Sequence, residues 1–148
     1  MSAPPLRFRP ARASDEPFIY SSWLRSYHEG GVAARFIERD VFMEGQKMLI
    51  ARLLRDSATW VAHPEGDDET ICGWLCGAEE YADVSETGAI VHYVYVKSCY
   101  RGLGVMRGLL EAVGIGATVE TTHLTRAVLQ FREHGHDWRF NPFYLMEA

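Results

Sequence analysis

Residues 94–105 read Val94-Tyr95-Val96-Lys97-Ser98-Cys99-Tyr100-Arg101-Gly102-Leu103-Gly104-Val105. They begin inside residues 89–96, a run rich in β-branched and aromatic side chains and apolar on both faces, which predicts a central strand. Residues 105–113 predict a helix. The glycines between the two elements let the backbone approach a ligand closely. The sequence therefore predicts a strand, a tight glycine turn and a helix.

The same part of the chain is locally basic. Residues 88–110 contain Lys97, Arg101 and Arg107 and no acid, whereas the whole chain has a net charge of −5. A helix N-terminus adds free N–H groups and the positive end of its dipole, so the turn is suited to a phosphate group. The third glycine of a dinucleotide fingerprint and the Gly-Lys-Ser/Thr of a P-loop are both absent. A plain glycine turn with surface arginines is the alternative interpretation.

Hydrophobic patterning extends the prediction to the whole chain. An N-cap at Ser14 begins a first helix that ends near residue 30, because a serine followed by acids is typical of a helix start. The element order predicts one α+β domain over residues 1–148, built on a mixed sheet. Strands are expected at 6–9, 59–62, 70–78, 89–96, 118–122 and 138–146, and further helices at 36–54, 105–113 and 125–134.

Composition excludes several classes of protein. The chain has 148 residues, 47% hydrophobic and 24% charged, as is usual for globular proteins. No apolar run reaches the roughly 18–20 residues of a membrane helix, and we expect a cytoplasmic protein that does not bind membranes. The acidic balance argues against nucleic acid as a partner. Three cysteines without a secretory signal predict free, buried thiols, with no metal site: Cys72, Cys76 and Cys99.

Residues 94–105 resemble the acetyl-CoA motif of the GCN5-related N-acetyltransferase (GNAT) superfamily, Arg/Gln-x-x-Gly-x-Gly/Ala after a Val-rich strand. The element order, the length, the opening at residues 9–15 and the late helix at 127–136 are also similar to the family, including its small phage-encoded members. The resemblance implies a GNAT fold with splayed strands, acetyl-CoA as cofactor, and a small-molecule or protein amine as acceptor. It leaves a homodimer open.

The resemblance also implies which residues hold the cofactor. Backbone groups of the last strand residues would bond the pantetheine arm, and N–H groups of the turn would hold the pyrophosphate. The implied cofactor-binding residues are Val94, Val96, Arg101, Gly102, Leu103, Gly104, Val105 and Met106.

Three positions depart from the family pattern. Met106 stands where glycine or alanine is preferred, so its side chain must turn away from the cofactor. Phe131 replaces a tyrosine that often protonates the departing thiolate, and Leu124 stands where many relatives carry asparagine. A GNAT-fold module that has lost catalysis and serves in binding is therefore the alternative to an acyltransferase. A DNA-base-modifying member is a third possibility that the acidic balance disfavours.

The candidate general base is His92, because alternation along a strand places it on the same face as Val94 and Val96. We expect it in the cleft between splayed strands, with one ring nitrogen open to solvent or substrate; a core histidine is the alternative. Glu80 is a second candidate base. Tyr27 and His28 fall where the family builds its acceptor site, and the eight acids of residues 61–90 would favour a cationic amine.

Overall fold

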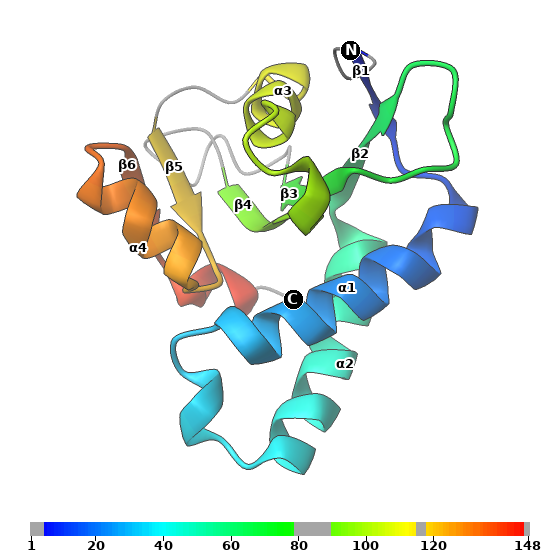
Figure 1. The fold of residues 1–148 in the computed structure, drawn as a ribbon. Coiled ribbons are helices and arrows are strands. Elements are labelled where there is room, and N and C mark those ends of the chain that lie inside the picture. Colours follow the sequence, from blue (N-terminus) through cyan, green and yellow to red (C-terminus); the bar gives the residue numbers. More distant parts are fainter. Residues whose placement is uncertain (1–4, 79–89, 115–117, 147–148) are drawn as a thin grey trace.

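The structure is a computed structural model, which describes residues 5–78, 90–114 and 118–146 (Figure 1). The described residues form one six-stranded sheet in the order β1-β2-β3-β4-β5-β6. The strands are β1 (Leu6–Pro10), β2 (Ala58–Pro64), β3 (Gly73–Ala78), β4 (Ile90–Val96), β5 (Thr118–Thr121) and β6 (Asp137–Phe140). The α-helices are α1 (Glu16–Gly30), α2 (Arg39–Asp56), α3 (Val105–Ala112) and α4 (Arg126–Glu133).

The sheet is mixed. Strands β1 to β4 pair antiparallel with their neighbours, whereas β4 pairs with β5, and β5 with β6, in parallel. Parallel pairing requires a crossover, and helices α3 and α4 make the two crossovers. The expected α+β class with a mixed sheet is confirmed.

Two apolar clusters cover the two faces of the sheet. One joins α1 and α2 to the sheet through Trp23, Ile50, Trp74 and Tyr93, all buried. The other joins α3 and α4 to the opposite face and includes Leu109. Along β4, Tyr93 and Tyr95 pack with the first cluster and Val94 and Val96 with the second, so this strand is covered on both faces, as its sequence predicts.

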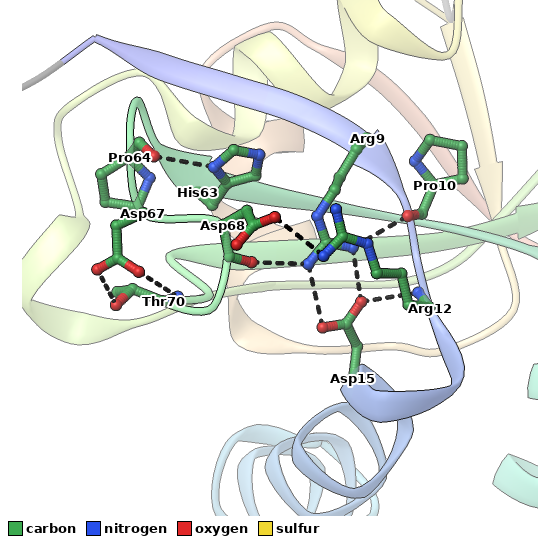
Figure 2. A network of polar contacts seen from close by, with 9 residues as sticks. All are labelled: Arg9, Pro10, Arg12, Asp15, His63, Pro64, Asp67, Asp68 and Thr70. Carbon is green, nitrogen blue, oxygen red and sulfur yellow. Dashed lines mark hydrogen bonds and ion pairs between the residues drawn. The ribbon is translucent and has the colours of Figure 1, made fainter.

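An ion-pair network fixes the start of the chain on the sheet. Figure 2 shows Arg9 of β1 reaching Asp15, whose Oδ2 accepts a hydrogen bond of 2.7 Å from the guanidinium and another of 2.7 Å from the Arg12 N–H. Arg9 also donates to the carbonyl of Asp68, in the β2–β3 turn, at 2.9 Å. Burial tends to raise the pKa of Asp15, but these hydrogen bonds and the charges of the arginines lower it overall. The network therefore ties β1, the start of α1 and the turn together.

Three local expectations are wrong. Ser14 is not the N-cap of α1. It lies within a 3₁₀ turn, Ala13–Asp15, in which the Asp15 carboxylate accepts a hydrogen bond from the Arg12 N–H. The expected strand at 138–146 ends at Phe140, and a 3₁₀ helix, Pro142–Met146, follows, because proline donates no ladder hydrogen bond. Cys72 and Cys76 are buried free thiols, but Cys99 is exposed.

No helix in the described part of the chain is long and apolar enough to cross a membrane.

Candidate functional site

The parallel strands β4 and β5 separate shortly after they meet. Within the described residues their ladder holds two pairs, Ile90 with Glu120 and Val91 with Thr121. Val94 and Val96 continue to pair with β3 on the other edge of β4 but have no ladder partner on β5. The edge of β4 that faces β5 therefore has backbone groups available to an extended ligand.

The glycine turn leads from this open edge to the N-terminus of α3. Gly102 and Gly104 have φ of 79° and 83°, a left-handed conformation that favours glycine. A Cβ at either position would meet no described atom within 4 Å, so the turn presents bare backbone. Gly104 is the N-cap of α3, and no described side chain caps the helix. These features fit a pyrophosphate group, because the first N–H groups of a helix have no partner within it.

The other residues of the turn differ in exposure. Val105 is buried and Met106 packs partly against the α3–α4 cluster, while Leu103 is half exposed. Arg101 is exposed, and its Nε donates to the carbonyl of Val96 at 3.4 Å. The Arg101 guanidinium therefore lies beside Val96, the last residue of β4, and the Met106 side chain packs toward the core.

His92 lies where β4 departs from regular alternation. Cys76 of β3 faces Tyr93 but the next residue, Gly77, faces Val91, so His92 is an extra residue of a β-bulge. The residue is 2% exposed, and its Nδ1 lies 2.9 Å from the Oγ1 of Thr122. The expectation of a solvent-facing nitrogen is therefore wrong. The Nε2 atom is enclosed and has no hydrogen-bond partner within the described ranges.

The surroundings of His92 keep it uncharged. Burial, together with the positive charge of Arg52 on α2, lowers the pKa of His92 from 6.5 to about 4. The ring borders a cavity of about 20 Å³ between β4, β5 and α4, lined also by Val94 and Phe131. That volume admits roughly one water molecule. His92 is thus a neutral imidazole beside a small cavity at the parting of the two strands.

A second buried histidine escaped the sequence analysis. His123 follows β5, is 2% exposed, and its Nδ1 lies 3.0 Å from the same Thr122 Oγ1 that contacts His92. Burial, with a smaller contribution from His92, lowers the pKa of His123 to about 3. The signal in the sequence was a titratable residue directly after the strand expected at residues 118–122.

The candidate acceptor residues lie on α1. The Tyr27 ring is 4.8 Å from that of His123 and 5.8 Å from that of Tyr93, so the fold brings Tyr27 beside the histidine pair. Burial raises the pKa of Tyr27. His28 packs instead against Phe42 of α2, with ring centroids 5.1 Å apart.

The remaining candidates are Glu80, the acidic run of residues 61–90 and Phe131. Glu80 lies outside the described residues. In the acidic run of residues 61–90, Glu65 pairs with Arg7 and Asp68 pairs with Arg12, so part of that charge is already neutralised. Phe131 of α4 packs 5.1 Å from Trp138 and borders the same cavity as His92.

A mixed sheet that opens beside a glycine turn is the fold that the GNAT resemblance implies. Residues 17–114 match the model of the Acetyltransferase (GNAT) family, and the chain belongs to this family. Members of the family bind acetyl-CoA and transfer its acetyl group. No curated protein sequence matches the chain.

Solved structures show the same fold. YycN, an inferred acetyltransferase from Bacillus subtilis, is 17% identical, with a TM-score of 0.66 over 90% of this chain and 92% of its own. An inferred acetyltransferase from Pyrococcus furiosus is 19% identical, with a TM-score of 0.55 over 93% of this chain and 96% of its own. At these identities the likeness concerns the fold.

Proposed function

We propose that the protein is an N-acyltransferase that transfers an acetyl group from acetyl-CoA to an amine by direct attack. The observation that supports it most is the continuity of two features: the open edge of β4 after Val91 runs directly into the bare glycine turn at α3. One binds an extended arm and the other a pyrophosphate, which are the two halves of CoA. Acetyl-CoA supplies an activated thioester when bound.

The residues of this chain then have separate tasks. Val94 and Val96 bond the arm through backbone groups, and residues 101–106 hold the phosphates, with Arg101 contributing positive charge. Holding the cofactor on β4 and the acceptor beside α1 orients the two reactants and lowers the entropic part of the barrier. Tyr27 and His28, at the end of α1, border the acceptor, which is a small-molecule or protein amine.

His92 accepts the proton that the attacking amine loses. Its low pKa leaves the imidazole unprotonated at neutral pH, so a nitrogen lone pair is available. The cavity beside the ring has room for one water molecule, through which the proton reaches an enclosed nitrogen. Glu80 stays the second candidate for this task.

One residue favours a second function. Phe131 borders the cavity but has no hydroxyl, so it gives no proton to a departing thiolate. A module that binds CoA without turning it over fits this substitution.

Calorimetric titration with CoA tests the cofactor site. Gly104→Glu should weaken CoA binding at least about 10-fold, because it places bulk and negative charge at the phosphates. Gly66→Glu is the matched control, since Gly66 has the same φ of 83° but lies in the β2–β3 turn. Equal affinity for CoA in both variants and the parent protein would remove the phosphate assignment.

Thiol release from acetyl-CoA with a panel of amines separates the two functions. His92→Asn should lower kcat about 10²-fold, the lower end of the usual effect of losing a general base, and leave CoA affinity unchanged. An unchanged kcat excludes His92 as the base. CoA binding without thiol release for any amine in the panel would favour the binding module.

A further inference from the structure

The Thr122 hydroxyl lies between two histidine rings. Its Oγ1 is 2.9 Å from Nδ1 of His92 and 3.0 Å from Nδ1 of His123, and all three side chains are buried. The two histidines belong to different parts of the fold, the bulge of β4 and the end of β5. Thr122 is thus the only described group that hydrogen-bonds both rings.

A hydroxyl carries one proton, and this limits the two rings. The Thr122 hydroxyl has no hydrogen-bond partner other than these two rings within the described residues. Its proton is therefore satisfied only if it is donated to one Nδ1, and the oxygen then accepts an N–H from the other Nδ1. A neutral imidazole has one N–H, so the ring that donates through Nδ1 has a lone pair at Nε2, and the other ring has an N–H there. The two histidines must therefore be in opposite tautomers while both are neutral.

The surroundings decide which ring has which tautomer. His123 makes edge contacts with three aromatic rings, at 4.8 Å from Tyr27, 5.5 Å from Trp23 and 5.8 Å from Tyr93. Nε2 of His123 is enclosed among these rings and has no hydrogen-bond partner in the described part of the chain. An aromatic environment tolerates an N–H better than a lone pair, which favours a proton on Nε2 of His123. His92 instead borders the small cavity of the proposed active site.

We propose that His123 is a positioning residue that acts through Thr122 to hold His92 in the tautomer with a lone pair at Nε2. This inference rests on the proposed function of His92. The hydrogen bonds run from His92 Nδ1–H to Thr122 Oγ1 and from the Thr122 hydroxyl to His123 Nδ1. Other groups near the pair are Arg52, which disfavours a proton on His92, and the backbone carbonyl of His92, which favours a proton on His123. The rings of Tyr27 and Tyr93 also lie beside His123.

Nitrogen NMR of the CoA-free protein, labelled with ¹⁵N at histidine, reads the tautomers directly. At pH 7 the parent protein should show His92 protonated at Nδ1 and His123 protonated at Nε2. Thr122→Val, which removes the hydroxyl at nearly constant shape, should let His92 populate the other tautomer. Thr122→Ser should restore the parent pattern.

Two variants of His123 give a matched pair. His123→Asn keeps an acceptor for the Thr122 hydroxyl and should keep the tautomer of His92, whereas His123→Leu removes the acceptor and should change it. In thiol-release assays, Thr122→Val and His123→Leu should lower kcat about 10-fold or more without weakening CoA binding, and Thr122→Ser and His123→Asn should not.

The outcomes separate this inference from the proposed function. Both rings in one tautomer, a reversed assignment, or a pattern that Thr122→Val leaves unchanged would each overturn it, whatever the protein catalyses. If the NMR pattern is as expected but His92→Asn keeps full activity, the coupled tautomers stand, and the role of His92 as base fails.

Discussion

Mild acid should destabilise the folded protein through His92 and His123. Burial lowers the pKa of these rings from 6.5 to about 4 and about 3. In the unfolded chain both rings take up a proton near pH 6.5, whereas in the folded protein they stay neutral until the pH is much lower. The unfolded state therefore binds more protons, and the free energy of unfolding must fall as the pH falls from about 6.5 toward 4.

The size of the effect follows from the pKa values. A difference of one pH unit below the unfolded pKa is worth about 1.4 kcal/mol for each ring. Lowering the pH from 7 to 5 should therefore cost about 2 kcal/mol for each histidine, or about 4 kcal/mol together. This is a large share of the roughly 5–15 kcal/mol that stabilises a typical domain.

Urea unfolding at pH 7, 6 and 5 measures this dependence. His92→Asn and His123→Asn keep a hydrogen-bonding group near Thr122 but do not titrate, so each should remove about half of the loss. Val91→Ala, at the neighbouring buried position, is the control: it should lower the free energy of unfolding by a similar amount at every pH. A double asparagine variant that still loses about 4 kcal/mol between pH 7 and 5 would refute the reasoning.

Two further changes test the site and its frame. Phe131→Tyr should leave kcat unchanged or raise it, because a hydroxyl at the cavity supplies a proton donor; a strong loss of kcat in a folded variant would mean that Phe131 does not face the thioester. Gly73→Ala should lower the free energy of unfolding by about 2 kcal/mol or more in urea titration, since its Cβ would lie 2.6 Å from the backbone oxygen of Tyr95 and 2.8 Å from Val105. Gly45→Ala, in open space on α2, should instead raise it by about 0.5–1 kcal/mol, and a loss there would contradict this account of the helix.

The elements that depend on neighbours in the sequence could be predicted. The run at residues 89–96 indicated a strand covered on both faces, and β4 is one, because β-branched and aromatic residues favour extended backbone and burial wherever they pack. The glycine turn and the start of α3 were also predicted, since positive φ at Gly102 and Gly104 is a local property of glycine.

The prediction that a ring nitrogen of His92 is open to solvent relied on regular spacing, which the tertiary structure interrupts. Alternation placed His92 on the face of Val94 and Val96, but it assumes an unbroken ladder, and the bulge moves Val91 into the same cluster as those two valines. Whether a strand bulges depends on its pairing with β3, which the sequence of β4 alone does not contain.

The histidine pair was decided by the fold alone. His92 and His123 are separated by a helix and a strand in the sequence. The parallel pairing of β4 with β5 brings His92 to Thr122, which His123 directly follows. The sequence determined which titratable side chains are present and where the glycine turn lies. The tertiary structure determined their burial, and with it their charge, because desolvation depends on atoms contributed by distant parts of the chain.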